Sequence, residues 1–363
     1  MLREAHLDGA VEEGIITAAQ AKALRNFAVQ HERPRARALG RDERFRFMRG
    51  FNDFFFATGV VMLGAGLMYF AGAGAAGNVL GAAILWALAE LLIGRLRLVL
   101  PGILIACLFV GMLYRAIPVD LFPVPTAGGP TIRAPSTWID LFMGGGMLTR
   151  TLAPPTVALR ALVGSGAAAL VYARFRLPFA LLLVAGGLVV ATAALSNTQS
   201  LVLLLCGLAV FAAAMVFDAS DRERLSRRSD CAFWLHLLAA PLIVHSLIAT
   251  AVPDLDFSKL TTPAALAIVL IVLALALIAV LIDRRALLVS TLSYLGIVIA
   301  YAIRNAGVNA PVDEIFFSTL VLLGVLVLVL GVGWQPLRRT LTLALPKSLL
   351  DRLPPAAPSW SHI

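Results

Sequence analysis

Ten hydrophobic stretches, each close to the length of a membrane-spanning helix, occupy most of the chain between Phe54 and Trp334. A helix rises about 1.5 Å per residue, so roughly 20 residues cross the hydrocarbon core of a bilayer. Backbone groups in lipid must be hydrogen-bonded within the protein, which favours helices. The sequence therefore predicts an all-α polytopic membrane helix bundle with ten spans, at 54–73, 76–93, 98–117, 155–173, 178–195, 201–217, 232–252, 263–282, 286–303 and 315–334.

Composition and charge agree with a membrane protein. Hydrophobic residues make up 60% of the chain and charged residues only 14%, which excludes a water-soluble domain. Of the 30 basic residues, 24 fall in the terminal segments and in alternate connections, five in the other connections and Arg160 inside a span. The positive-inside rule then predicts that both termini are cytoplasmic, and we expect a bacterial inner membrane. The net charge of +9 indicates anionic lipid headgroups as a partner and not nucleic acid.

Three segments flank or precede the membrane domain at 54–334. Residues 1–32 predict a cytosolic helical hairpin, with one helix ending at Gly14 and the next capped by Thr17 and Gln20. So small a hairpin needs support from the membrane domain, the lipid surface or a second copy in a homo-oligomer. Residues 33–53 form a basic juxtamembrane linker with seven arginines, and residues 335–363 an amphipathic cytoplasmic tail.

The hairpin carries a resemblance to a known family. The run from Val11 to Leu24, Val-Glu-Glu-Gly-Ile-Ile-Thr-Ala-Ala-Gln-Ala-Lys-Ala-Leu, resembles the short cytosolic hairpin that opens a family of bacterial multi-pass membrane proteins of unknown function. In that family a hairpin, a basic linker and a long hydrophobic array follow in this order. The resemblance implies architecture and transfers no activity.

Four ionisable residues lie inside the predicted spans, where each needs a physical reason. Glu90 and His236 are both about 8 Å below the cytoplasmic face by helix rise, which predicts that they pair. Arg160 and His245 lie about 8 to 12 Å below the opposite face and are predicted to face an outer cavity. A carboxylate beside a histidine creates a group able to carry protons at physiological pH.

Simpler structural roles compete with this polar site. Either histidine can serve as a hydrogen-bonded structural group, Glu90 can reach towards nearby arginines, and Arg160 can extend to the outer interface. Acidic and basic residues at span ends, namely Arg115, Asp218, Asp283 and Arg304, are interpreted as side chains that reach the headgroups.

The sequence gives no support for enzymatic chemistry. None of the three lysines follows a glycine, so a P-loop lysine is absent, and neither HExxH nor GxSxG occurs. His236 and His245 are nine residues apart and point to opposite faces of a straight helix, so they are not expected to share a metal or haem. We expect no catalytic residues, no metal and no cofactor; a membrane enzyme built from dispersed residues stays open.

Two functions remain in competition. Ten spans with both ends inside can divide into two five-span halves of opposite orientation, which favours a transporter with a polar intramembrane cavity. The alternative is a non-transporting scaffold or regulatory protein that oligomerises or binds partners through the hairpin. The long connection from Pro118 to Pro154 contains the run Ile139 to Gly146, interpreted either as a re-entrant element or as a surface loop.

Overall fold

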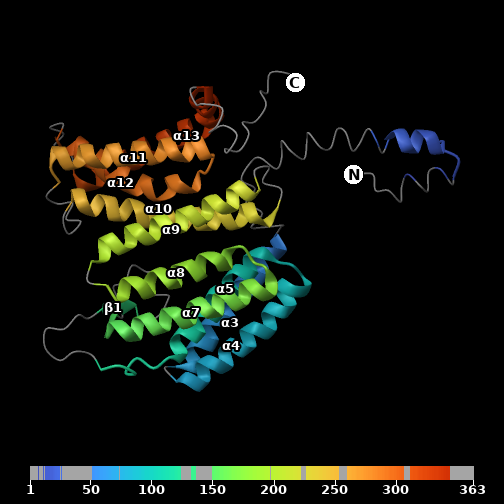
Figure 1. The fold of residues 1–363 in the computed structure, drawn as a ribbon, viewed down its shortest axis with the longest axis horizontal. Coiled ribbons are helices and arrows are strands. Elements are labelled where there is room, and N and C mark those ends of the chain that lie inside the picture. The colour runs from blue at the N-terminus through green and yellow to red at the C-terminus, as the bar shows by residue number, and fades with distance from the viewer. Residues whose placement is uncertain are drawn as a thin grey trace.

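The computed structural model of the protein describes residues 7, 11, 13–24, 26, 51–72, 74–123, 132–135, 149–196, 198–221, 226–252, 260–305 and 311–343. In the described part after residue 50, ten long helices run side by side (Figure 1). Each of the ten predicted spans coincides with one of them, and the predicted all-α membrane bundle is confirmed.

The first five of these helices pack together (Figure 1). Their shared core is formed by small and branched side chains such as Val60, Leu85, Ile105, Val171 and Ala180, one from each helix. The helices are α3 (Phe51–Ala71), α4 (Ala75–Ala89), which continues as the π-helix η1 (Glu90–Arg95), α5 (Val99–Ala116), α7 (Pro154–Phe175) and α8 (Phe179–Ala194).

The last five helices form a second group, and α8 joins it to the first through contacts of Val189 with Val210 and its neighbours. Its core includes Leu235, Val272 and Leu287. The helices are α9 (Gln199–Ser220), α10 (Arg227–Ala251), α11 (Thr262–Ile282), α12 (Ala286–Asn305) and α13 (Val312–Leu343). Helix α13 continues through Pro336, nine residues beyond the predicted end of its span at Trp334.

The outer surface of the bundle is apolar. Large side chains such as Phe70, Leu328 and Val332 are 87%, 70% and 85% exposed, an arrangement that suits lipid and not water. Among the described residues, eight helices are long and apolar enough to cross a membrane; α8, with 16 residues, is shorter, and α12 also lies outside this group. The chain is therefore a multi-pass membrane protein.

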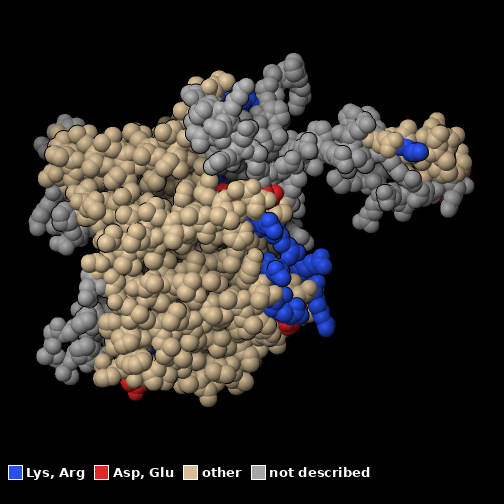
Figure 2. All heavy atoms as spheres, in the orientation of Figure 1, with Lys and Arg blue, Asp and Glu red and all other residues tan. Residues whose placement is uncertain are grey.

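Charge is distributed unevenly between the two ends of the helices. Figure 2 shows a continuous band of Lys and Arg side chains at one end of the bundle. The exposed arginines at this end are Arg95, Arg97, Arg174, Arg176, Arg227, Arg228 and Arg285. We call it the basic end.

The connection between α5 and α7 contains the described strands of the chain. Strand β1 (Ile132–Pro135) pairs antiparallel with β2 (Thr149–Leu152), and Ile132 is opposite Leu152. The sequence predicted no strand here, because neither segment is longer than four residues and neither shows a sustained alternation of polar and apolar positions. The run 139–146, interpreted as a re-entrant element or a loop, lies outside the described residues.

The predicted helix stop and start in the N-terminal segment are confirmed. Gly14 has a φ of +71°, the left-handed conformation that closes a helix, and its N–H donates to the carbonyl of Val11. The Thr17 N–H donates to Gln20 Oε1 at 2.8 Å, and the Gln20 N–H donates to Thr17 Oγ1 at 3.2 Å. This reciprocal pair is the predicted capping box. Linker residues 33–50 and tail residues 344–363 lie outside the described residues.

Helices α7 and α8 approach each other closely at Gly187. A Cβ at this position would lie 2.8 Å from the carbonyl oxygen of Ala161 and 2.8 Å from Ser165 Cβ. We therefore expect Gly187→Ala to push the two helices apart and to lower the free energy of unfolding by about 1–3 kcal/mol. Denaturation by sodium dodecyl sulfate in mixed micelles measures this change.

The neighbouring glycine supplies the matched control. A Cβ at Gly186 would meet no atom within 4 Å. Gly186→Ala should leave stability unchanged or raise it by up to about 1 kcal/mol, because alanine is the better helix former. Equal effects of the two substitutions would contradict a tight α7–α8 contact.

Candidate functional site

Glu90 and His236 do not form the predicted pair. Glu90 is the first residue of η1, and its Oε2 accepts a hydrogen bond from Arg174 Nη2 at 2.7 Å. These two side chains are 36% and 53% exposed. His236 is fully buried and lies 2.9 Å from Asp218 instead. The depth estimated from helix rise placed Glu90 and His236 near the basic end, which is correct. The partner predicted from that depth is wrong for both residues.

Arg160 and His245 are also not brought together. Arg160 is 6% exposed, and its Nε donates to the backbone oxygen of Ile117 at 3.0 Å, while its guanidinium lies over the ring of Tyr114. It thereby satisfies a carbonyl at the end of α5, where helical partners are missing. His245 Nδ1 lies 2.8 Å from the hydroxyl of Tyr294 on α12. These contacts do not join Arg160 to His245, and the outer cavity stays a prediction.

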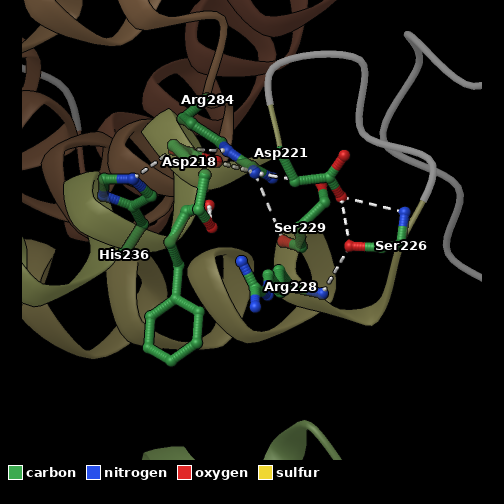
Figure 3. A network of polar contacts seen from close by, with 9 residues as sticks. Asp218, Asp221, Ser226, Arg228, Ser229, His236 and Arg284 are labelled. Atoms are coloured by element: carbon green, nitrogen blue, oxygen red, sulfur yellow. Dashed lines mark hydrogen bonds and ion pairs between the residues drawn. The ribbon is translucent and has the colours of Figure 1, made fainter.

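The strongest candidate site is a buried ionic network around Asp218 (Figure 3). Asp218 lies in the last turn of α9 and accepts hydrogen bonds from two directions. His236 of α10 approaches Oδ2 through Nε2 at 2.9 Å, and Arg284 donates from Nε to Oδ2 at 3.1 Å and from Nη2 to Oδ1. Figure 3 shows the carboxylate between the imidazole and the guanidinium.

The backbone at the end of α11 aims Arg284 into this site. Asp283 adopts the left-handed conformation (φ 58°, ψ 48°), and its N–H donates to the carbonyl of Val280. The Arg284 N–H donates to the carbonyl of Ala279 at 2.8 Å. These two bonds make a Schellman motif, which ends the helix and turns the following residue back towards it. Arg284 Nη2 also reaches Ser229 on α10, at 3.1 Å from Oγ and 3.2 Å from the carbonyl oxygen.

Burial and charge make this network unusual. Exposure is 0% for His236, 1% for Arg284 and 6% for Asp218. Charged groups taken out of water are costly unless they are paired and hydrogen-bonded, and the Asp218–Arg284 pair meets both conditions. A neutral His236 leaves the three-residue site without net charge. An ionised carboxylate only accepts hydrogen bonds, so Nε2 carries the shared hydrogen and further protonation occurs at Nδ1.

A second ionic contact extends the network to α13. Trp334 Nε1 donates to Asp283 Oδ1 at 2.8 Å, and Arg338 Nη1 lies 3.5 Å from Asp283 Oδ2. The Arg285 guanidinium lies over the Trp334 ring at 5.4 Å from its centroid. Trp334 and Arg338 are both 1% exposed. The turn between α11 and α12 is therefore held to α9 and α10 through Arg284 and to α13 through Asp283.

Sequence reasoning missed this network because Asp218 and Asp283 stand at the ends of spans, where we interpreted them as side chains that reach the headgroups. That interpretation is wrong, since both carboxylates are buried against arginines. A usable signal was present. Each aspartate directly follows an apolar span at the face where arginines dominate the connections, and a carboxylate placed there is well suited to pair with one of them.

Other chemistry is not indicated in the described part of the chain. No group of three or more His, Cys, Asp and Glu side chains in those ranges is arranged to hold a metal ion. The cysteines Cys107, Cys206 and Cys231 are free thiols. Comparisons with family models, with curated proteins and with solved structures found no match. The buried network thus has to be interpreted from its own geometry.

Proposed function

We propose that this chain is a transporter-like protein of the bacterial inner membrane with both termini cytoplasmic, in which the Asp218–Arg284–His236 network is a proton-sensitive gate. The band of arginines at the basic end supports this orientation, because basic residues are retained on the cytoplasmic side. The observation that carries the proposal is the burial of three ionisable side chains that join α9, α10 and the α11–α12 turn. Ionisable residues inside a membrane domain are functional candidates by default.

The proposed mechanism follows from competition for one carboxylate. A proton on His236 turns a neutral donor into a second cation beside Asp218 and gives the buried site a net positive charge. The Asp218–Arg284 pair then weakens, because the carboxylate is shared between two cations. Arg284 sits in the turn between α11 and α12, so its release frees that turn from α9 and α10. Opening at the basic end would then admit water between these helices.

Thiol accessibility one helical turn below the gate tests this mechanism. Ala214 lies four residues before Asp218 on the same face of α9 and is 0% exposed. The thiolate is the reactive form of a cysteine and becomes scarcer as the pH falls, so the labelling rate is divided by that of a free thiol at the same pH. In a chain whose native cysteines are replaced, we expect this relative rate for Ala214→Cys with a membrane-impermeant thiol reagent to be several-fold higher at a pH of about 5.5 than at about 7.5, on either side of an ordinary histidine pKa.

Two histidine variants show whether His236 is the sensor. His236→Gln keeps an N–H donor for Asp218 and removes the titration, so the pH dependence should disappear. His245→Gln, on the same helix, should retain it because His245 contacts Tyr294. Equal relative rates at both pH values in the chain that keeps both histidines, or loss of pH dependence in both variants, would contradict the gate.

One observation favours the scaffold as the second candidate. Beside the capped helix of the N-terminal segment, Ile15 and Leu24 are 70% and 46% exposed, which leaves apolar surface for a partner or a second copy. A scaffold needs no water path, so Ala214→Cys would stay protected at every pH. The same labelling experiment therefore separates the two functions.

A further inference from the structure

The arginine band at the basic end brings together three helix ends. Arg95 ends η1 and Arg97 follows it, Arg174 lies in the last turn of α7 and Arg176 caps it, and Arg227 and Arg228 begin α10; all six are exposed. The ends are in contact with one another. Glu90 of η1 bonds Arg174, and the Tyr172 hydroxyl of α7 lies 3.9 Å from Cys231 Sγ of α10. Arg176 lies four residues after Tyr172, and Arg228 lies three residues before Cys231, so this contact brings the two arginines to the same end of the bundle.

Positive charge exceeds the negative charge within this band. Glu90 and Asp230 are the carboxylates on the same three segments, and they face six arginines. Arg174 donates one N–H to Glu90, whereas a guanidinium has five N–H donors arranged to bind a phosphate or carboxylate through two at once. With Arg174 53% exposed, its remaining donors can reach a ligand from outside.

The backbone at Glu90 is also unusual. Residues Glu90–Arg95 form a π-helix, a rare widening of the helix that occurs frequently at functional sites. The Glu90 carboxylate lies close to Gly94, 3.4 Å from where a Cβ would stand, and points across to α7. The Glu90 carboxylate thereby occupies the position on Arg174 that an anionic ligand from outside the protein would take.

The surroundings determine which kind of anion fits. The Arg174 guanidinium lies 5.3 Å from the Phe175 ring centroid, and Phe175 packs against Trp86. Nearby, Phe179 packs against Trp234. Trp86 lies four residues before Glu90 and therefore about one helical turn deeper than the arginines, and Leu91 beside Glu90 is 46% exposed on the apolar surface. A ligand at this position has its charge among arginines and its remainder against an apolar wall.

We propose that these helix ends form a binding site for an anionic phospholipid, whose phosphate displaces Glu90 from Arg174 and is also held by Arg176 and Arg228. The apolar surface next to the band takes the acyl chains. Glu90 competes with the phosphate for Arg174 and so lowers the affinity of the site for the phospholipid. This site is separate from the Asp218 network and does not depend on the gate.

Binding to the full-length protein in a neutral detergent tests the proposal. Phosphatidylglycerol is titrated against phosphatidylcholine, and bound lipid is counted by native mass spectrometry. We expect Arg174→Ala and Arg176→Ala each to weaken phosphatidylglycerol binding about five-fold. Arg304→Ala, an exposed arginine at the opposite end of the bundle, should have no effect.

The direction in which the phosphatidylglycerol affinity changes in Glu90→Gln decides the test. Because the glutamine no longer competes as an anion, phosphatidylglycerol should bind about two- to five-fold more tightly than to the unsubstituted chain. Weaker binding in this variant would overturn the proposal, as would equal affinity for phosphatidylcholine or equal losses in Arg174→Ala and Arg304→Ala. Full displacement of the lipid by inorganic phosphate at equal concentration would identify a free-phosphate site and also overturn it.

Discussion

Asp218→Ala is expected to lower the free energy of unfolding by about 3–5 kcal/mol, because the substitution leaves a buried guanidinium without its carboxylate. Arg284 is 1% exposed, and its Nε and Nη2 both donate to Asp218. Its Nη2 also donates to Ser229, but these acceptors are uncharged oxygens and do not replace the carboxylate. Unfolding by sodium dodecyl sulfate in mixed micelles measures the loss.

A double substitution and an exposed pair make this prediction specific. Replacing both partners, Asp218→Asn with Arg284→Met, removes the unpaired charge and should recover most of the lost stability. Glu90→Ala breaks the half-exposed pair with Arg174, and exposed pairs contribute only about 0–1 kcal/mol. If Asp218→Ala and Glu90→Ala have equal effects, Asp218 is not the buried centre of the network.

Sequence predicted the helices well because the membrane imposes length and composition on each span separately. All ten apolar stretches became helices, and the Thr17–Gln20 cap formed because its signal is contained in four consecutive residues. Such local patterns depend on no other part of the chain. The β1–β2 pair, by contrast, depends on two short segments that are separate in the chain and meet only in the folded protein.

The candidate site depended on information that a single span does not contain. Depth from the membrane face placed Glu90 and His236 at the same level, but it does not say which helices are neighbours. In the structure Glu90 faces α7 and His236 faces α9. The contact between Arg284 and Asp218 joins residues 66 positions apart and requires the Schellman turn at Asp283. Tertiary packing therefore decides the partners, whereas hydropathy decides only the depth.

The largest effect expected at the C-terminal helix is that of Trp334→Ala, which should lower the free energy of unfolding by about 3–5 kcal/mol. Helix α13 presents most of its surface outward, and its described buried residues are Thr319, Trp334 and Arg338. Trp334 supplies the large apolar contact, against Ala240, Val280 and Leu287 in one cluster. Removal of the indole leaves a cavity there and also removes a hydrogen bond to the buried Asp283.

Two further substitutions separate the packing of the Trp334 indole from its hydrogen bond and show the effect of an exposed residue on the same helix. Trp334→Phe keeps most of the packing and loses the Nε1 donor to Asp283, so we expect a smaller loss of about 1.5–3 kcal/mol, the range for a hydrogen bond to a charged group. The matched control is a surface leucine of the same helix.

Leu328→Ala alters a side chain that is 70% exposed on α13 and should change stability by less than about 0.5 kcal/mol. A loss in Leu328→Ala as large as in Trp334→Ala would mean that the outward surface of α13, and not the Trp334 contact, holds the helix in place. We expect the loss of free energy of unfolding to be largest for Trp334→Ala and smallest for Leu328→Ala. This order would show that Trp334 attaches α13 to the α11–α12 turn. Because Asp283 and Arg284 are adjacent in that turn, the same attachment would restrain the movement that opens the proposed gate.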